Sequence, residues 1–228
     1  MPVVDLAATT KRDLNAQLHA LSAVTNETLW RVENPAGQHA LAVGLDAPIT
    51  VEIAGHAGYY CAGMNAHASV IVEGNAGVGV AENMMSGTVH VKGDASQAAG
   101  ATAQGGLLVV DGDASARCGI SMKGVDIVVK GSIGPMSAFM GQSGNLVVLG
   151  DAGDALGDSI YEARLFVRGT VKSLGADCIE KEMRDDHRVQ LRRLLDAAGL
   201  ADVQPDEFKR YGSARTLYNF HVDNAADY

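Results

Sequence analysis

The sequence predicts an all-β solenoid: a right-handed parallel β-helix of the single-stranded type, with about seven 19-residue coils and flanking helices at both ends. Three observations carry this prediction: glycine is abundant, it recurs at a fixed interval, and alternating apolar residues precede each recurring glycine. Of the 27 glycines, only Gly37, Gly44, Gly199 and Gly212 lie outside residues 55–175. The middle of the chain therefore differs in structure from both ends.

The recurring glycines are 19 residues apart without an insertion or deletion: Gly55, Gly74, Gly93, Gly112, Gly131, Gly150 and Gly169. Two residues before each of them stands a β-branched residue, from Ile53 to Val167, and four residues before stands another aliphatic residue, from Val51 to Leu165. This alternation is typical of a short strand with one buried face. A unit of 19 residues cannot bury that face alone, so the units are expected to stack into a solenoid.

The same spacing argues against two other solenoids. A leucine-rich repeat has a similar length, but return segments such as Ser96–Gln104 lack its leucines. A left-handed β-helix of hexapeptides needs a period that is a multiple of six, and 19 is not. Right-handed winding is expected from the general preference for right-handed crossovers between parallel strands.

Each unit continues with a turn and then a position of minimal size. A polar residue follows the glycine in most copies: Asn75, Asp94, Asp113, Ser132 and Asp151. Such residues are expected to cap a turn through their own backbone. Seven residues after the recurring glycine the side chain is always Ala or Gly, as at Ala62, Gly100 and Gly119, which predicts a close backbone approach.

The chain is expected to divide into residues 1–48, 49–180 and 181–228. The first part should hold a helix capped by Thr9 or Thr10, then extended segments over 28–32 and 40–43. The second part forms the coils. A helix before Gly199 is predicted from its apolar residues, which are Ile179, Met183, Leu191, Leu194, Leu195 and Ala198. Both end segments are expected to cover the unpaired strand edges of the solenoid.

The tail is rich in aromatic residues and needs a surface on which to pack. We expect Tyr211, Tyr218, Phe220 and Tyr228 to be candidate contacts with a partner subunit. The alternative is that these side chains pack back on this chain.

Composition narrows the function. A net charge of −9 disfavours binding to nucleic acid or to an anionic membrane, because both need clustered Lys and Arg. The sequence has neither a membrane-spanning apolar stretch nor a signal peptide, which predicts a cytoplasmic protein.

The sequence predicts no catalytic, cofactor-binding or metal-binding residue in this chain. Cys61 and Cys118 occupy equivalent positions three coils apart and cannot share a metal, which leaves Cys178 as the candidate for a reactive thiol. His56 and His67 could face each other across one coil. No metal-binding motif, phosphate loop or nucleophile and base pair is present.

Several segments resemble a known family. Gly77-Val78-Gly79-Val80-Ala81, together with the recurring pattern seen in Gly93–Gly100, resembles the GXGXG β-helix domain of the glutamate synthase large subunit, with Ala81 at the third glycine. Leu174–Cys178 and the tail segments Tyr211–Arg215 and Leu217–Asn224 are similar to the free-standing form of that domain, a subunit of N-methylglutamate synthase.

The resemblance implies a non-catalytic scaffold subunit of a complex that forms N-methylglutamate from methylamine and glutamate. Its partners would be an amidotransferase-like subunit and a synthase-like subunit that carries FMN and iron–sulfur clusters. Two other functions remain open here. One is the β-helix subunit of a formylmethanofuran dehydrogenase-like complex, and the other is a stand-alone carbohydrate-active enzyme with Asp94 and Asp113 as its candidate carboxylates.

Overall fold

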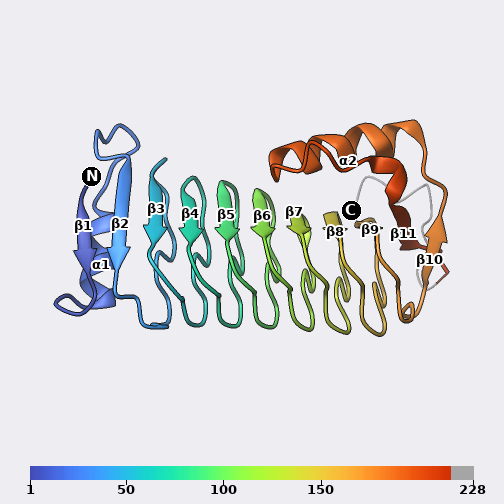
Figure 1. Ribbon diagram of the computed structural model, residues 1–228, viewed down its shortest axis with the longest axis horizontal. Coiled ribbons are helices and arrows are strands. Elements are labelled where there is room, and N and C mark those ends of the chain that lie inside the picture. Colours follow the sequence, from blue (N-terminus) through green and yellow to red (C-terminus); the bar gives the residue numbers. More distant parts are fainter. Residues whose placement is uncertain (217–228) are drawn as a thin grey trace, which may run out of the picture.

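The computed structural model describes residues 1–216 and confirms the predicted solenoid (Figure 1). The described strands form one 11-stranded sheet in the order β1-β2-β3-β4-β5-β6-β7-β8-β9-β11-β10. The seven predicted coils contribute β3 (Thr50–Ile53), β4 (Ser69–Val72), β5 (Thr88–Val91), β6 (Leu107–Val110), β7 (Lys123–Val129), β8 (Ser143–Val148) and β9 (Arg164–Val167). All neighbouring pairs from β1 to β9 are parallel.

Successive coils align with the 19-residue shift of the recurring glycines. Val70 of β4 pairs with Val51 of β3 and with Val89 of β5, and a second line of bridges joins Ala57 to Ala76 and continues to Val171. The two alternating apolar residues of each strand point into the coil, where Val70 and Val72 are fully buried. The last coil departs from the repeat, because Leu156 pairs with Leu174, one residue short of 19.

The sheet begins before residue 49. β1 (Val3–Asp5) and β2 (Leu29–Glu33) precede the predicted coils, and β2 pairs in parallel with β3. The predicted N-terminal helix is α1 (Lys11–His19), where the Thr10 side chain accepts the Asp13 N–H and Leu14 and Leu18 are buried. Leu21 lies beyond the end of this helix but still packs against the core.

The prediction of an extended segment over residues 40–43 is wrong. Ala40 and Ala42 have φ values of 57° and 55°, in the left-handed region, and the segment forms turns. The Ala40 N–H donates to the Tyr59 carbonyl of the first predicted coil. This segment is therefore the return segment of a further N-terminal coil.

The predicted C-terminal helix exists, but it starts later and lies elsewhere than expected. It is α2 (Asp185–Ala197), whereas Ile179 belongs to β10 (Cys178–Lys181) and Met183 precedes the helix. In Figure 1, α2 lies over the later strands of the sheet and does not cover its end. The edge of β9, the strand of the last predicted coil, is covered by β11 (Lys209–Ser213), which follows the short 3-10 helix η1 (Pro205–Glu207) and pairs antiparallel with both β9 and β10.

The position of α2 follows from the outward side chains of the sheet. The same outward position holds Glu52, Ile71 and His90 in β3 to β5, but apolar residues in the later strands. These apolar strand residues form a second core with α2 and with the segment after it. The strands contribute Val109, Val128, Val147 and Phe166, α2 contributes Leu191, Leu194 and Leu195, and Phe208 follows the helix. Only the later strands offer an apolar outer face, so the amphipathic helix packs there.

The minimal-side-chain column needs left-handed backbone as well as space. Six of its members have φ between 54° and 68°: Ala62, Ala81, Gly100, Gly119, Ala138 and Gly157. The seventh, Ala176, is exposed, since the last coil is one residue shorter. In Gly77–Ala81, Gly79 and Ala81 are left-handed, and a β-carbon on Gly77 would lie 2.6 Å from the Gly58 carbonyl carbon. These constraints explain the small residues of the segment.

The polar turn residues form a hydrogen-bonded ladder between coils, which corrects the predicted cap on their own backbone. Asp94 N–H donates to Asn75 Oδ1 at 3.0 Å, Asp113 N–H to Asp94 Oδ1 at 2.9 Å, and Ser132 N–H to Asp113 Oδ1 at 2.7 Å. The ladder runs from His56 to Thr170. Each side chain thus satisfies a backbone donor of the next coil.

The ladder also explains the recurring glycines. A β-carbon added to Gly93 or Gly112 would overlap the Oδ1 atom of Asn75 or Asp94, the ladder residue one coil earlier. The same overlap would arise between Gly131 and Asp113. Glycine and polar residue therefore repeat together, because each side chain occupies the space that the next glycine leaves free.

A double-mutant cycle tests this coupling. Gly112→Ala is expected to lower the free energy of unfolding by about 2 to 3 kcal/mol through overlap with Asp94. Asp94→Ala should cost about 1 kcal/mol, since it removes one hydrogen bond. In the Asp94→Ala background, Gly112→Ala should cost less than half of its single effect, measured by urea denaturation. Strictly additive losses would contradict the coupling.

Candidate functional site

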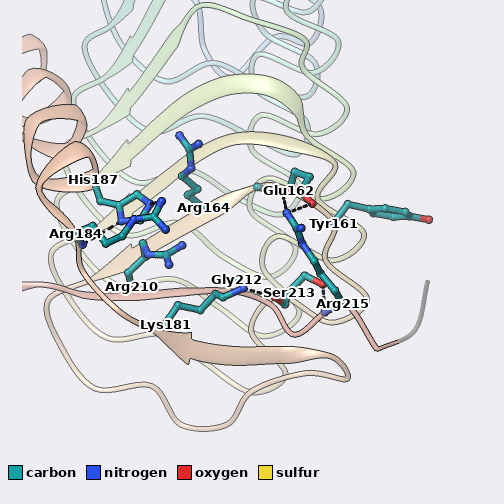
Figure 2. A pocket seen from close by; sticks show the side chains of 11 residues that line it. Tyr161, Glu162, Arg164, Lys181, Arg184, His187, Arg210, Gly212, Ser213 and Arg215 are labelled. Atoms are coloured by element: carbon teal, nitrogen blue, oxygen red, sulfur yellow. Dashed lines mark hydrogen bonds and ion pairs between the residues drawn. The ribbon is translucent and has the colours of Figure 1, made fainter. Parts of the chain in front are cut away.

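A pocket lies where the start of α2 meets the last strands of the sheet (Figure 2). Its volume is about 390 Å³. Because β11 lies between β9 and β10, side chains from β9, β10, α2 and β11 line one hollow. The charged and polar lining residues are Glu162, Arg164, Lys181, Arg184, His187, Arg210, Ser213 and Arg215. We call this hollow the basic pocket, since five of these residues are Lys or Arg.

Two of the five cations are neutralised by carboxylates. Arg184 Nε and Nη2 donate to the two carboxylate oxygens of Asp186, each at 3.2 Å. The hydrogen bond from Arg184 lowers the pKa of Asp186 to about 2, although partial desolvation acts in the opposite direction. Arg215 Nη2 lies 2.8 Å from Glu162 Oε1. Their charges are therefore paired before any ligand arrives.

The other three cations have neutral hydrogen-bond partners and no ion pair within residues 1–216. Arg164 Nη1 donates to Gln190 Oε1 at 2.6 Å, Lys181 Nζ to the Ser213 carbonyl at 2.7 Å, and Arg210 Nε to the Glu182 carbonyl at 2.9 Å. These bonds hold the side chains in place without cancelling their charges.

The positive charges are close enough to disfavour one another. Burial lowers the pKa of Arg210, and repulsion from Arg184 and Arg164 lowers it further, while Asp186 and Glu182 act in the opposite direction. A bound anion would relieve this repulsion. The pocket is therefore chemically suited to negative charge.

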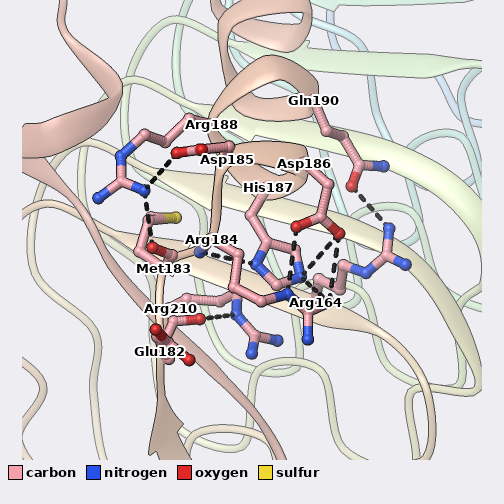
Figure 3. A network of polar contacts seen from close by, with 10 residues as sticks. All are labelled: Arg164, Glu182, Met183, Arg184, Asp185, Asp186, His187, Arg188, Gln190 and Arg210. Carbon is pink, nitrogen blue, oxygen red and sulfur yellow. Dashed lines mark hydrogen bonds and ion pairs between the residues drawn. The ribbon is translucent and has the colours of Figure 1, made fainter.

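His187 lies at one side of the basic pocket, next to Arg184 (Figure 3). Its side chain is only 2% exposed, and its Nδ1 accepts the Arg184 N–H at 3.2 Å, which caps the start of α2. Burial lowers the pKa of His187, and the neighbouring Arg210 lowers it further. The imidazole is thus neutral at pH 7 and fixes the start of the helix beside Arg184.

The structure places the predicted aromatic contact Tyr211 in the core. Tyr211 belongs to β11 and is 5% exposed, so it packs back on this chain, as the alternative expectation had it. Tyr218, Phe220 and Tyr228 lie outside the described residues.

The prediction that Cys178 is a reactive thiol is wrong, because its side chain is buried. Burial raises the pKa of Cys178 to about 12, and nearby Asp177 and Asp158 raise it further. Cys61 and Cys118 are fully buried, and burial raises the pKa of each to about 12. All three thiols are protonated near neutral pH.

The candidate histidines and carboxylates do not form a site. His56 Nδ1 accepts the Asn75 N–H, whereas His67 lies beside Asp46, 3.6 Å from its carboxylate. Asp94 and Asp113 each accept a backbone N–H of the next coil, which gives both carboxylates a structural role in the ladder. Within the described part of the chain, no group of three His, Cys, Asp or Glu is placed to hold a metal ion. Neither α1 nor α2 is long and apolar enough to cross a membrane.

The basic pocket was missed by the sequence analysis. Arg164, Lys181 and Arg210 come from three different strands, β9, β10 and β11, so no single segment of the sequence shows the cluster. Charged residues on a helix, as over 184–193, usually form only its solvated face, so this stretch does not indicate a site. The one available signal was Arg164, a basic residue at an outward strand position.

Comparison with known proteins finds a full-length relative. The chain is 66% identical over 228 residues to Protein GlxC of Rhizobium meliloti (strain 1021), and the match covers all of both chains. No family model and no solved structure matches the chain.

Proposed function

Since the chain belongs to the family of Protein GlxC, we propose that it is a non-catalytic scaffold subunit of a glutamate synthase-like complex, of the N-methylglutamate synthase type. That complex would form N-methylglutamate from methylamine and glutamate in the cytoplasm. An amidotransferase-like subunit and an FMN and iron–sulfur synthase-like subunit are its proposed partners.

One observation carries the proposal: the backbone of the segment that resembles the GXGXG domain. Gly79 and Ala81 adopt the left-handed conformation, and Gly77 lies against the backbone of Gly58 in the preceding coil. Equivalent left-handed residues recur in the other coils, as at Gly100 and Gly119. This backbone explains why the segment needs small residues at the positions on which the resemblance rests.

The fold suits a rigid spacer. Two lines of parallel bridges and the side-chain ladder connect each coil to the next, so that adjacent coils are joined at three places. At a strand spacing of about 4.8 Å, seven coils span roughly 30 Å. A spacer of this kind would hold two catalytic subunits in register, and small errors in such positioning lower rates greatly.

Part of the sheet is free to meet a partner. The outer face over β3 to β5 lies outside the core that α2 forms with the later strands. At one edge of this face, His90 of β5 joins a charged network with residues that follow β6 and β7: Asp111 accepts from His90 Nε2 and from Lys130 Nζ, both at 2.8 Å. Burial would raise the pKa of Asp111, but the bonds from Lys130 and His90 outweigh it and lower that pKa. These three side chains are therefore held in place by their own hydrogen bonds, without a partner subunit.

Purification of the tagged chain from its native host tests the proposal. We expect a yellow-brown complex whose absorbance spectrum shows flavin and iron–sulfur clusters, and in which mass spectrometry identifies amidotransferase-like and synthase-like chains. A complex with molybdenum or tungsten and dehydrogenase chains would instead point to the formylmethanofuran dehydrogenase type. A chain that purifies alone and colourless would contradict the proposal.

A further inference from the structure

The basic pocket holds three positively charged side chains that form no ion pair within residues 1–216. Arg164, Lys181 and Arg210 each bind a neutral oxygen, while Glu162 and Asp186 beside the pocket are already paired with other arginines. The Glu182 carboxylate favours the charged form of Arg210 but forms no ion pair with it. This concentration of positive charge occurs in a chain with a net charge of −9. General surface charge therefore does not explain it.

The geometry points to a compact dianion as the ligand of this pocket, and we propose that it binds a small molecule with either a phosphate monoester or two carboxylates. Three unpaired cations favour a ligand with at least two negative charges. A volume of about 390 Å³ is at the lower end of the usual range for small-molecule sites, which favours a compact ligand.

The three basic side chains are already ordered in the absence of a ligand. Each has one donor fixed by a hydrogen bond to the protein, and Arg164 and Arg210 keep further guanidinium N–H groups that are suited to paired oxygens. Because the side chains are already ordered, less conformational entropy is lost on binding.

The structure also accounts for the other groups that face the ligand. Arg184 and Arg215 are positive but paired with Asp186 and Glu162, and His187 is neutral at pH 7 because burial lowers its pKa. The ligand is therefore held mainly by Arg164, Lys181 and Arg210. The proposal concerns this chain alone and does not depend on the identity of its partners.

Binding to the purified full chain tests the proposal. Inorganic phosphate and succinate serve as probes in isothermal titration calorimetry and in thermal melts, with sodium chloride at equal ionic strength as the reference. We expect at least one probe to bind and to raise the melting temperature, as a ligand of the native state does. Tighter binding of phosphate would indicate a phosphate monoester, and tighter binding of succinate would indicate a dicarboxylate.

Charge-removing variants locate the site. Lys181→Met and Arg164→Met should each weaken binding of the effective probe at least tenfold. Lys209→Met is the matched control, because Lys209 lies beside Arg210 in β11 but pairs with Glu180 outside the pocket. It should change binding less than twofold. The proposal is overturned if neither probe exceeds chloride, or if Lys209→Met weakens binding as much as Lys181→Met.

Discussion

Replacing Gly100 by valine is expected to lower the free energy of unfolding by about 3 to 5 kcal/mol, the sum of backbone strain and overpacking. Gly100 has φ of 67°, a conformation that a β-branched residue strongly disfavours. Its β-carbon would also lie 2.7 Å from Ile127 Cδ1 and 3.3 Å from Leu108 Cδ2, inside the coil. Urea denaturation of the purified variant measures the loss.

Gly199→Val separates the two contributions. Gly199 has φ of 75° just after α2, and a β-carbon there would meet nothing within 4 Å. This variant should show only the strain, about 1 to 2 kcal/mol. If Gly100→Val costs no more than Gly199→Val, the minimal-side-chain column does not face the core and the coil geometry is wrong.

Phe166→Ala should cost about 3 to 5 kcal/mol, the usual loss when a buried phenylalanine is truncated. Phe166 points outward from β9, yet it is fully buried because α2 and Phe208 cover it. The loss would show that the second core contributes to stability as the interior of the coils does. Thermal or urea unfolding measures it.

Ile71→Ala is the matched control for Phe166→Ala. Ile71 occupies the same outward position five coils earlier, where it lies outside the second core and is only partly buried. We expect a loss below about 1 kcal/mol there, because a half-exposed side chain loses little burial. Similar losses at both positions would contradict the placement of α2 over the later strands alone.

The coils could be predicted because the residues that determine their structure recur at a fixed interval in the sequence. Each strand repeats the same two buried positions, and each turn repeats the same pair of glycine and polar residue, as in Gly112 and Asp113. The residue pattern did not reveal the hydrogen-bond partner of each polar side chain. The side-chain oxygen accepts a backbone N–H of the next coil and not one of its own turn. That partner is 19 residues away and becomes a neighbour only after the coils stack.

The C-terminal part could be predicted only in outline. Apolar residues at helical spacing correctly indicated α2, but Ile179 was assigned to it although pairing with Gly212 of β11 places that residue in a strand. Tertiary pairing overrode the local pattern. The basic pocket depends on the same pairing, because β11 carries Arg210 between Arg164 of β9 and Lys181 of β10.

The most direct test of the scaffold role is native mass spectrometry of the two proposed partner subunits, mixed with and without this chain. The account predicts that the amidotransferase-like and synthase-like subunits form a joint complex only when this chain is present. A stable complex of the two subunits in its absence would contradict the account.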